Sequence, residues 1–259
     1  MRLLFIGDIM GNAGQEMVLN WLPDLLREEQ IDFTIANGEN ATGGFGLSKK
    51  HFQRLIDCGV DAITMGNHTW DNKDIYRYID HEPRIVRPAN YHASLPGRGW
   101  RTYSVGEEKL VLINLIGRVF MKPCDCPFAT VDHILSQVEN EIVVVDFHGE
   151  ATSEKVAMGW HLDGKVAAVV GTHTHVQTND ARILPRGTGY LTDVGMTGPR
   201  DSVLGVEKEI ILERFITGFS PRFETARGDR QFNAVLFDIG EDHRCQEVKL
   251  LNFWEPALS

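Results

Sequence analysis

Five segments of the sequence share one pattern, in which an apolar run ends in small residues and a side chain that can bind a metal ion. The endings are Phe5-Ile6-Gly7-Asp8, Gly38-Glu39-Asn40, Gly66-Asn67-His68, Phe147-His148 and Gly171-Thr172-His173-Thr174-His175. If the apolar runs are strands, their carboxyl ends converge on one crevice of an α/β sheet. We therefore expect one metal site that contains Asp8, Glu39, Asn40, Asn67, His148, His173 and His175.

Each of these residues, taken singly, also has an ordinary structural explanation. Asp8 could cap a helix, and the pairs Glu39–Asn40 and Asn67–His68 could belong to glycine-flanked turns. The pair His173 and His175 is less easily explained in this way. Alternate residues such as these can face the same pair of metal ions only where the chain stays extended or bends to aim both side chains. Independent caps and turns have no reason to occupy so many consecutive strand ends, so the joint pattern favours metal binding.

The expected ligands are carboxylate, amide and imidazole groups, without a thiolate. Mixed oxygen and nitrogen donors suit manganese, iron or zinc. A structural zinc site would instead be rich in cysteine. Paired ions about 3.5–4 Å apart are the usual clamp for displacement at phosphorus. We expect two divalent or trivalent ions, with iron or manganese first and zinc or magnesium as alternatives.

Charge and composition limit the partners of the protein. The formal net charge is −10 and no basic stripe runs along the chain, so duplex DNA or RNA is not an expected partner. Bound cations outweigh distant carboxylates, so a small phosphodiester substrate is compatible with this charge. With 259 residues, of which 42% are hydrophobic, the chain is expected to form a single domain over residues 1–259. A homo-oligomer is also compatible, because closed homo-oligomers are common.

The chain carries no predicted signal peptide or membrane segment. The run after Met1 is too short for a signal peptide, and no apolar stretch approaches the roughly 20 residues of a membrane-spanning helix. We expect a cytoplasmic protein that does not bind membranes, with its four cysteines reduced. Cys124-Asp125-Cys126 lacks a second cysteine or histidine pair nearby, and we interpret it as two loop thiols.

The first half of the chain alternates strand and helix patterns. Strands are expected over Leu3 to Ile6, Phe33 to Ala36 and Ala62 to Met65. The first helix between them buries Met17, Trp21, Leu22, Leu25 and Leu26 on one face. Ser48 is expected to cap the second helix, which ends at Gly59. This order predicts neighbouring parallel strands.

The second half adds antiparallel strands. Arg101 to Val105 and Leu110 to Leu115 are expected to form a hairpin joined by Gly106 to Lys109. Further strands are expected over 142–147, 166–170, 183–184, 190–192, 233–239 and 247–253, with helices around 131–138, from about Ser153, and over 207–215. A four-layer α/β/β/α sandwich of mixed sheets accommodates this order better than a purely parallel sheet.

The motif order resembles the calcineurin-like metallophosphoesterase superfamily, whose signatures run D-x-H, G-D, G-N-H, H and G-H-x-H. Two positions depart from that pattern. Met10 stands where the first motif has its histidine, and Glu39 replaces the bridging aspartate, with Asn40 beside it as a substitute ligand. Together with segments 87–90, 148–155 and 192–198, these departures are similar to the bacterial YmdB-like branch.

The resemblance implies how the ligands divide between the two ions. One ion would take Asp8, Glu39, Asn40 and His175, and the other would take Glu39, Asn67, His148 and His173. Glu39 would bridge the ions, and a hydroxide shared between them would attack phosphorus. His68 is implied to be the general acid, a role that suits imidazole near neutral pH, whereas the alternative is a buried structural histidine.

The YmdB-like resemblance also implies hydrolysis of cyclic nucleotides, notably 2′,3′-cyclic nucleoside monophosphates. The residues alone favour phosphoester hydrolysis without a covalent intermediate, because neither a G-x-x-x-x-G-K loop nor a G-x-S-x-G elbow is present. One alternative is a phosphomonoesterase or nucleotidase, with Arg87, Arg118 and Arg200 as candidate cationic groups for its dianionic substrate. Another is a regulatory module that binds RNA or a protein and has a secondary metal site.

The remaining histidines lie in helical or loop patterns without a matching neighbour. We interpret all six as surface or packing residues: His51, His81, His92, His133, His161 and His243. Four further polar residues lie near the site segments and receive no assigned role, because sequence does not separate ligand orientation from capping. They are Glu150, Thr152, Thr174 and Thr197.

Overall fold

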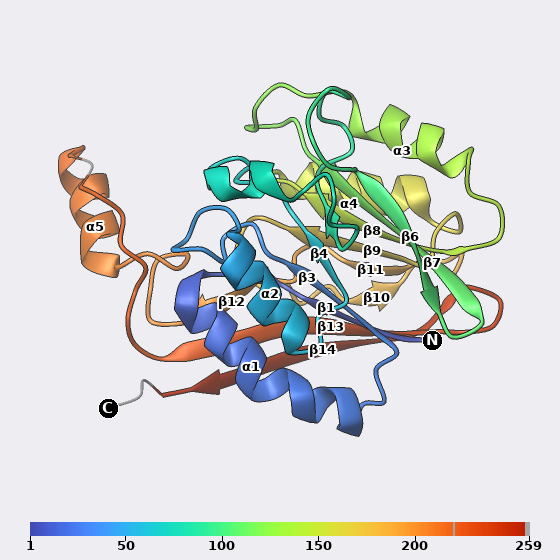
Figure 1. Cartoon of the computed structure of the whole chain (residues 1–259), viewed down its shortest axis with the longest axis horizontal. Coiled ribbons are helices and arrows are strands. Elements are labelled where there is room, and N and C mark those ends of the chain that lie inside the picture. The colour runs from blue at the N-terminus through green and yellow to red at the C-terminus, as the bar shows by residue number, and fades with distance from the viewer. Residues whose placement is uncertain (220, 257–259) are drawn as a thin grey trace.

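Two mixed β-sheets pack face to face in the computed structural model, which describes residues 1–219 and 221–256 (Figure 1). The domain expected over 1–259 thus extends beyond the described residues at its C-terminal end. The first sheet has eight strands: β1 (Arg2–Ile6), β2 (Asp8–Ile9), β3 (Phe33–Asn37), β4 (Ala62–Thr64), β5 (Ile85–Val86), β12 (Met196–Pro199), β13 (Arg230–Ile239) and β14 (Cys245–Glu255). Strands β1, β3, β4 and β5 run parallel, and β13 lies antiparallel to both β1 and β14.

The second sheet has six strands in the order β10-β11-β9-β8-β7-β6. Its members are β6 (Trp100–Val105), β7 (Glu108–Ile116), β8 (Ile142–His148), β9 (Ala168–Thr172), β10 (Arg182–Ile183) and β11 (Gly189–Leu191). Strands β7, β8, β9 and β11 are parallel, and β6 and β10 add antiparallel edges. The βα order of the middle of the chain accounts for the parallel centre.

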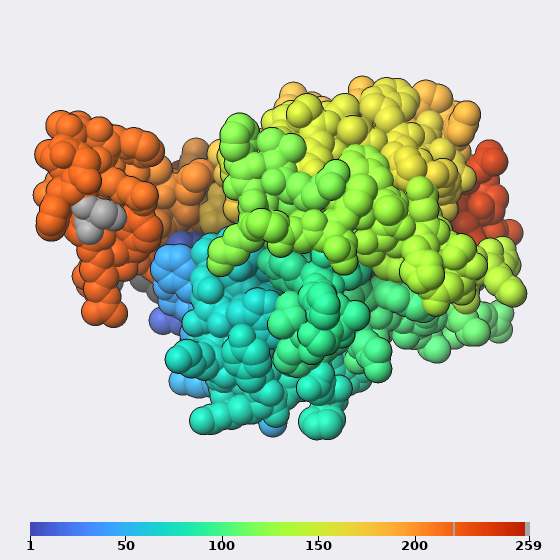
Figure 2. Space-filling view, turned by 90° about the horizontal axis from the view of Figure 1, so that it is seen from above, coloured from blue at the N-terminus to red at the C-terminus, as the bar shows by residue number. Residues whose placement is uncertain are grey.

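Helices cover the outer face of each sheet. Helices α1 (Gly11–Glu28) and α2 (Lys49–Asp57) lie on the first sheet, and α3 (Pro127–Leu135) and α4 (Thr152–Leu162) lie on the second (Figure 1). A 3₁₀-helix (Lys73–Arg77) follows β4, and α5 (Lys208–Thr217) stands away from the body of the molecule in Figure 2. Among the described residues, no helix is long and apolar enough to cross a bilayer.

Alternation along β1 shows how the layers are held together. Leu4 and Ile6 pack with α1 and α2, whereas Leu3 and Phe5 pack between the two sheets. Successive side chains of a strand point to opposite faces, so one strand contributes to both clusters. A third cluster joins the second sheet to α3 and α4. The predicted α/β/β/α sandwich is therefore confirmed.

Several element boundaries differ from the predictions. The hairpin loop is shorter than expected, because Val105 pairs directly with Glu108 and only two residues connect the strands. The strand predicted over 166–170 begins at Ala168, the first residue that pairs with β8. Strands β5 and β12 were not predicted, since two and four residues are too few to show a period. The cap at Ser48 is confirmed, because its hydroxyl accepts a hydrogen bond from His51 N.

Candidate functional site

The predicted ligands all lie at the ends of strands, where the two sheets meet. Asp8 begins β2, residues 39–40 follow β3, and Asn67 follows β4 of the first sheet. His148 is the last residue of β8, and residues 173–175 follow β9 of the second sheet. Each sheet thus contributes one side of a shared site.

His148 lies at the centre of this group and is fully buried. Its Nε2 atom lies 3.0 Å from Glu39 Oε1 and 3.0 Å from Asn67 Oδ1. The Nδ1 atom of His173 lies 3.1 Å from the same Nε2. Glu39, His148 and His173 together form a group whose ligand atoms all lie within 4.8 Å of one another. Several lone pairs thus converge on one point, which is the arrangement that a cation requires.

Asp8 and Asn40 each contribute a buried oxygen that has no hydrogen-bond partner among the described residues. Asp8 is fully buried, and its Oδ2 accepts a hydrogen bond of 3.3 Å from His173 N. Its Oδ1 lies 3.9 Å from His148 Nδ1 and accepts no hydrogen bond from the described residues. The Oδ1 atom of Asn40 is likewise unpaired, although its Nδ2 donates to Gly44 O at 2.8 Å. An unpaired buried acceptor costs free energy unless something binds it. These oxygens therefore fit the hard-donor part of a metal site.

The other ring nitrogen of His148 is fixed by a chain of hydrogen bonds that the sequence analysis missed. Nδ1 lies 2.9 Å from Thr172 Oγ1, and the same hydroxyl donates to Asp146 Oδ1 at 2.7 Å. An Nδ1 proton held in this way leaves Nε2 free as a ligand atom. The sequence signal was present, because Asp146 lies two residues before His148 on an otherwise apolar strand and so shares its face.

His173 and His175 are aimed by a bend in the chain rather than by a strand. Both have positive φ, of 101° and 65°, and the strand β9 ends at Thr172. Nε2 of His173 lies 3.0 Å from Glu150 Oε2, and Nδ1 of His175 lies 3.0 Å from Leu204 O. Such φ values are uncommon outside glycine and persist where the surroundings enforce them.

A buried ion pair supports this bend. Asp193 accepts hydrogen bonds from Thr174 N at 3.1 Å and from Thr174 Oγ1 at 2.7 Å. The same carboxylate forms an ion pair with Lys155, and both side chains are almost completely buried. Thr174, which received no role from the sequence, therefore anchors the segment between the two histidines. The pair Lys155 and Asp193 was not predicted, because its members are far apart in sequence.

His68 lies beside the cluster and contacts it through its backbone. Its backbone N donates a hydrogen bond of 2.7 Å to Glu39 Oε2, which fixes the position of that carboxylate. Its Nδ1 lies 2.7 Å from Asp71 Oδ2, and the side chain is partly exposed. This contact orients the ring and leaves Nε2 available to other partners. A buried structural histidine does not describe this residue, since its side chain is 26% exposed.

Gly66 is required by the close approach of two predicted ligands, Glu39 and His148. A Cβ atom at this position would lie 2.4 Å from His148 Nε2 and 2.5 Å from Glu39 Oε2. These distances are far shorter than van der Waals contact, so any side chain would displace one of the two groups. The glycine before Asn67 is thus part of the site's construction.

Burial and charge act in opposite directions on the clustered groups. Burial alone would raise the pKa of Glu39 and lower that of His148, but their mutual contact lowers the pKa of Glu39 and raises that of His148 to about 9. Burial raises the pKa of Asp8 well above its usual range, and nearby carboxylates add to this effect. Burial, with His148 next to it, lowers the pKa of His173 to about 3. The site therefore crowds carboxyl groups together, and a bound cation would favour their ionised forms.

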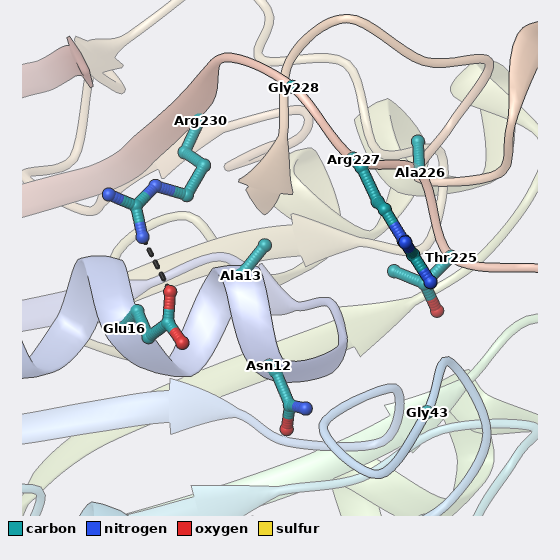
Figure 3. Close-up of a pocket in the computed structure, with 9 residues that line it drawn as sticks. All are labelled: Asn12, Ala13, Glu16, Gly43, Thr225, Ala226, Arg227, Gly228 and Arg230. Carbon is teal, nitrogen blue, oxygen red and sulfur yellow. Dashed lines mark hydrogen bonds and ion pairs between the residues drawn. The ribbon is translucent and has the colours of Figure 1, made fainter. Parts of the chain in front are cut away.

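A cavity of 210 Å³ opens onto this cluster and is lined by Glu39, Asn40, His68, Glu150, His173, Thr174, His175 and Leu204. Among the described residues that line it, none is lysine or arginine. A larger cavity of 390 Å³ lies at the start of α1 (Figure 3), where Arg230 forms an ion pair with Glu16. Its described lining contains no histidine or cysteine, so the smaller cavity is the candidate functional site.

The three arginines considered as phosphate ligands lie elsewhere in the described structure. Arg87 is buried and its guanidinium donates to the backbone oxygens of Pro88, Leu95 and Pro96. Arg200 lies 4.8 Å from the Trp254 ring. Neither these two nor Arg118 is among the described residues that line the cavity. The same holds for the six histidines that were interpreted as surface or packing residues.

Comparisons with known proteins agree on one family. A family model described as "YmdB-like protein" matches residues 4–251. The 2′,3′-cyclic-nucleotide 2′-phosphodiesterase of Bacillus subtilis (strain 168) is 49% identical over 252 residues, which cover 96% of this chain and 95% of that protein.

Solved structures agree with the fold. The crystal structure of a hypothetical protein from Thermus thermophilus has a TM-score of 0.95 and 44% identity, covering 99% of this chain and 100% of that chain. A 5′-nucleotidase precursor from the same organism has a TM-score of 0.61 at 12% identity, covering 99% of this chain and 54% of that chain. At that identity the likeness concerns the fold alone, and it is the metallophosphoesterase fold that the sequence predicts.

Proposed function

The chain belongs to the YmdB-like protein family and is a phosphoesterase, and we propose that it hydrolyses 2′,3′-cyclic nucleotides with two bound metal ions. The observation that carries the proposal is the convergence of Glu39, Asn67 and His173 on Nε2 of His148, each within 3.1 Å. The similarity to the Bacillus subtilis 2′,3′-cyclic-nucleotide 2′-phosphodiesterase supports the substrate class.

Two ions would share the clustered residues. One would be held by Asp8, Glu39, Asn40 and His175, and the other by Glu39, Asn67, His148 and His173. Two unpaired buried oxygens, on Asp8 and Asn40, support this division. When bound, such ions supply an activated water and offset the charge that develops at phosphorus. Iron or manganese fits this mixture of oxygen and nitrogen donors, and zinc or magnesium is the alternative.

The cavity favours a diester over a monoester substrate. A phosphomonoester is a dianion near neutral pH and is usually held by extra cationic side chains. No lysine or arginine is among the described residues that line the cavity. A cyclic diester carries one negative charge, which two ions can neutralise without such groups. The phosphomonoesterase alternative therefore has less support.

His68 is proposed as the general acid that protonates the leaving oxygen. It lines the cavity, and Asp71 Oδ2 lies 2.7 Å from its Nδ1, which directs Nε2 away from that carboxylate. Positioned proton transfer typically contributes about 10²–10⁴-fold to the rate. The backbone N of His68 also fixes Glu39, so one residue positions a ligand and supplies a proton.

The test is turnover of 2′,3′-cyclic AMP and of a phosphomonoester by the wild type and Asn67→Ala, with elemental analysis of the same samples. We expect diester hydrolysis by the wild type, and its loss together with one metal equivalent in Asn67→Ala. Asn140→Ala, on an exposed loop, is the matched control and should behave as the wild type. Two bound metals without turnover of either compound would overturn the proposal and favour the regulatory module.

The role of His68 requires a separate comparison of leaving groups. We expect His68→Ala to slow the hydrolysis of 2′,3′-cyclic AMP, whose leaving group is an alkoxide, by roughly 10²–10⁴-fold. Bis(p-nitrophenyl) phosphate, with its good leaving group, should be affected far less. His92→Ala, away from the cavity lining, is the control. Wild-type turnover of 2′,3′-cyclic AMP by His68→Ala would exclude the assignment.

A further inference from the structure

Phe45 contacts the ring of His68, and His68 lines the 210 Å³ cavity. The two ring centroids are 5.1 Å apart and the ring planes meet at 71°, an edge-to-face arrangement. In such a pair, at least one face of the phenyl ring is not covered by the imidazole. The Phe45 residue is also 40% exposed, so an aromatic residue reaches solvent next to the proposed general acid.

A glycine-rich loop fixes Phe45 at this place. Phe45 N donates to Thr42 O at 3.1 Å, and Thr42 N donates to Gly46 O at 3.0 Å. A Cβ atom at Gly46 would lie 2.6 Å from Asn72 N, so only glycine allows this close packing. The loop is also tied to the proposed ligand Asn40, whose Nδ2 donates to Gly44 O at 2.8 Å. Hydrogen bonds and close packing therefore hold the backbone of the loop, which presents a partly exposed aromatic side chain.

Leu204 supplies an apolar surface in the cavity itself. Among the described residues that line the cavity, it alone is apolar, and it is 49% exposed. Its φ is +53°, and its carbonyl accepts the hydrogen bond from Nδ1 of His175. A leucine in this conformation is strained, and the turn is closed by two hydrogen bonds between Val203 and Val206. Backbone contacts thus hold an apolar side chain beside a proposed metal ligand.

We propose that Phe45 and Leu204 bind the nucleobase of the cyclic nucleotide, with Phe45 stacking on it. This inference rests on the proposed function. The polar part of the cavity suits the cyclic phosphate, whereas the base needs an apolar surface within reach of it. An aromatic ring can stack on any of the nucleobases, because every base has a π-face. The larger surface of purines should make them the better substrates.

The experiment compares 2′,3′-cyclic AMP with methyl β-D-riboside 2′,3′-cyclic phosphate, which has the same diester and no base. The quantity measured is the ratio of the two kcat/KM values. We expect Phe45→Ala to lower this ratio by roughly 10-fold to 100-fold, mainly through KM. Phe45→Trp should keep it, and Leu204→Ala should lower it less. Phe215→Ala, which removes an 81% exposed ring on α5, is the matched control and should leave the ratio unchanged.

Three results would overturn the base site. Unchanged kcat/KM values of Phe45→Ala for both compounds would mean that the ring does not contact the base. An equal fall for both compounds would mean that Phe45 acts through His68 instead. Equal kcat/KM values of the wild type for both compounds would reject the base site while leaving the phosphodiesterase proposal intact. If the wild type hydrolysed neither compound, the proposed function itself would fail, and the base site with it.

Discussion

Oε2 of Glu150 lies 3.0 Å from Nε2 of His173, the histidine whose Nδ1 faces the centre of the site. A carboxylate in this position orients a ligating imidazole and makes it a stronger donor. We expect Glu150→Gln, which keeps the shape and removes the charge, to lower metal affinity by about 10- to 100-fold. Chelator competition followed by elemental analysis measures that affinity.

The matched control for Glu150 is Glu139→Gln, an exposed carboxylate that does not line the cavity. It should keep wild-type metal content at every chelator concentration. If Glu150→Gln retained its metals as firmly as this control, the carboxylate would not act on His173. Glu150 would then line the cavity without affecting metal binding.

Gly66 offers a prediction about geometry. A methyl group there would lie 2.4 Å from His148 Nε2 and 2.5 Å from Glu39 Oε2, so Gly66→Ala must move one of them. A displacement of about 1 Å in a catalytic site can cost 10²-fold in rate. We expect a fall of roughly that size in kcat/KM, together with lower metal content, while the circular dichroism spectrum stays unchanged.

Gly149→Ala controls for a methyl group added beside the same histidine. The added Cβ would meet its nearest neighbours at 3.7 Å, which is ordinary van der Waals contact. This variant should keep most of its activity. Full metal content in Gly66→Ala, measured on the same preparation, would show that the site relaxes more easily than the structure indicates.

The ion pair between Lys155 and Asp193 predicts a large effect on stability. Removing one partner of a buried pair leaves an uncompensated charge and typically costs about 3–5 kcal/mol. We expect Lys155→Met to lower the free energy of unfolding by that amount, measured with urea in the presence of a chelator. The double variant Lys155→Met/Asp193→Asn should lose less, because it removes the stranded charge.

An exposed pair provides the comparison for this experiment. Lys165 lies 3.3 Å from Asp132, and both side chains are about half exposed, at 45% and 49%. Lys165→Met should cost no more than about 1 kcal/mol, since solvent screens such pairs. Equal losses of unfolding free energy in Lys155→Met and Lys165→Met would mean that burial does not make the pair of Lys155 and Asp193 more important for stability.

The sequence was sufficient for the features that depend on local pattern. Strand β3 and the cap at Ser48 follow from apolar runs and from the residue that precedes a helix, and both are observed. The layer order followed from the alternation of these elements. The sequence also placed Glu39, His148 and His173 at strand ends, and the structure brings their ligand atoms together.

Contacts between distant segments were beyond the reach of the sequence. Asp146 supports His148 through a hydroxyl on a neighbouring strand, and Lys155 meets Asp193 across 38 positions. The position of Asp146 two residues before His148 indicates a shared face of β8. The local pattern does not indicate that the Thr172 hydroxyl links these two side chains, or that Lys155 pairs with Asp193. The bend that aims His173 was also unpredictable, because positive φ in a non-glycine residue depends on its surroundings.

His51 makes the stability of the Phe45 loop depend on pH. Thr42 Oγ1 accepts a hydrogen bond from Ser48 N at 2.8 Å and lies 2.9 Å from Nδ1 of His51. The hydroxyl donates to Nδ1 only when that nitrogen carries no proton. Burial lowers the pKa of His51 below 6.5, and the charges of Lys50 and Arg54 add to this effect.

The sign of the pH effect follows from that shift. The unfolded chain binds a proton at His51 more readily than the folded chain does, so stability is complete above pH 6.5 and falls as the pH drops through the lower folded pKa. We expect the wild type to lose more free energy of unfolding between about pH 7.5 and 5.5 than His51→Asn, whose amide oxygen replaces Nδ1 as acceptor. Urea denaturation of both proteins at the two pH values gives the comparison. Equal losses would mean that His51 does not titrate in this range, or that the loop does not depend on its neutral form.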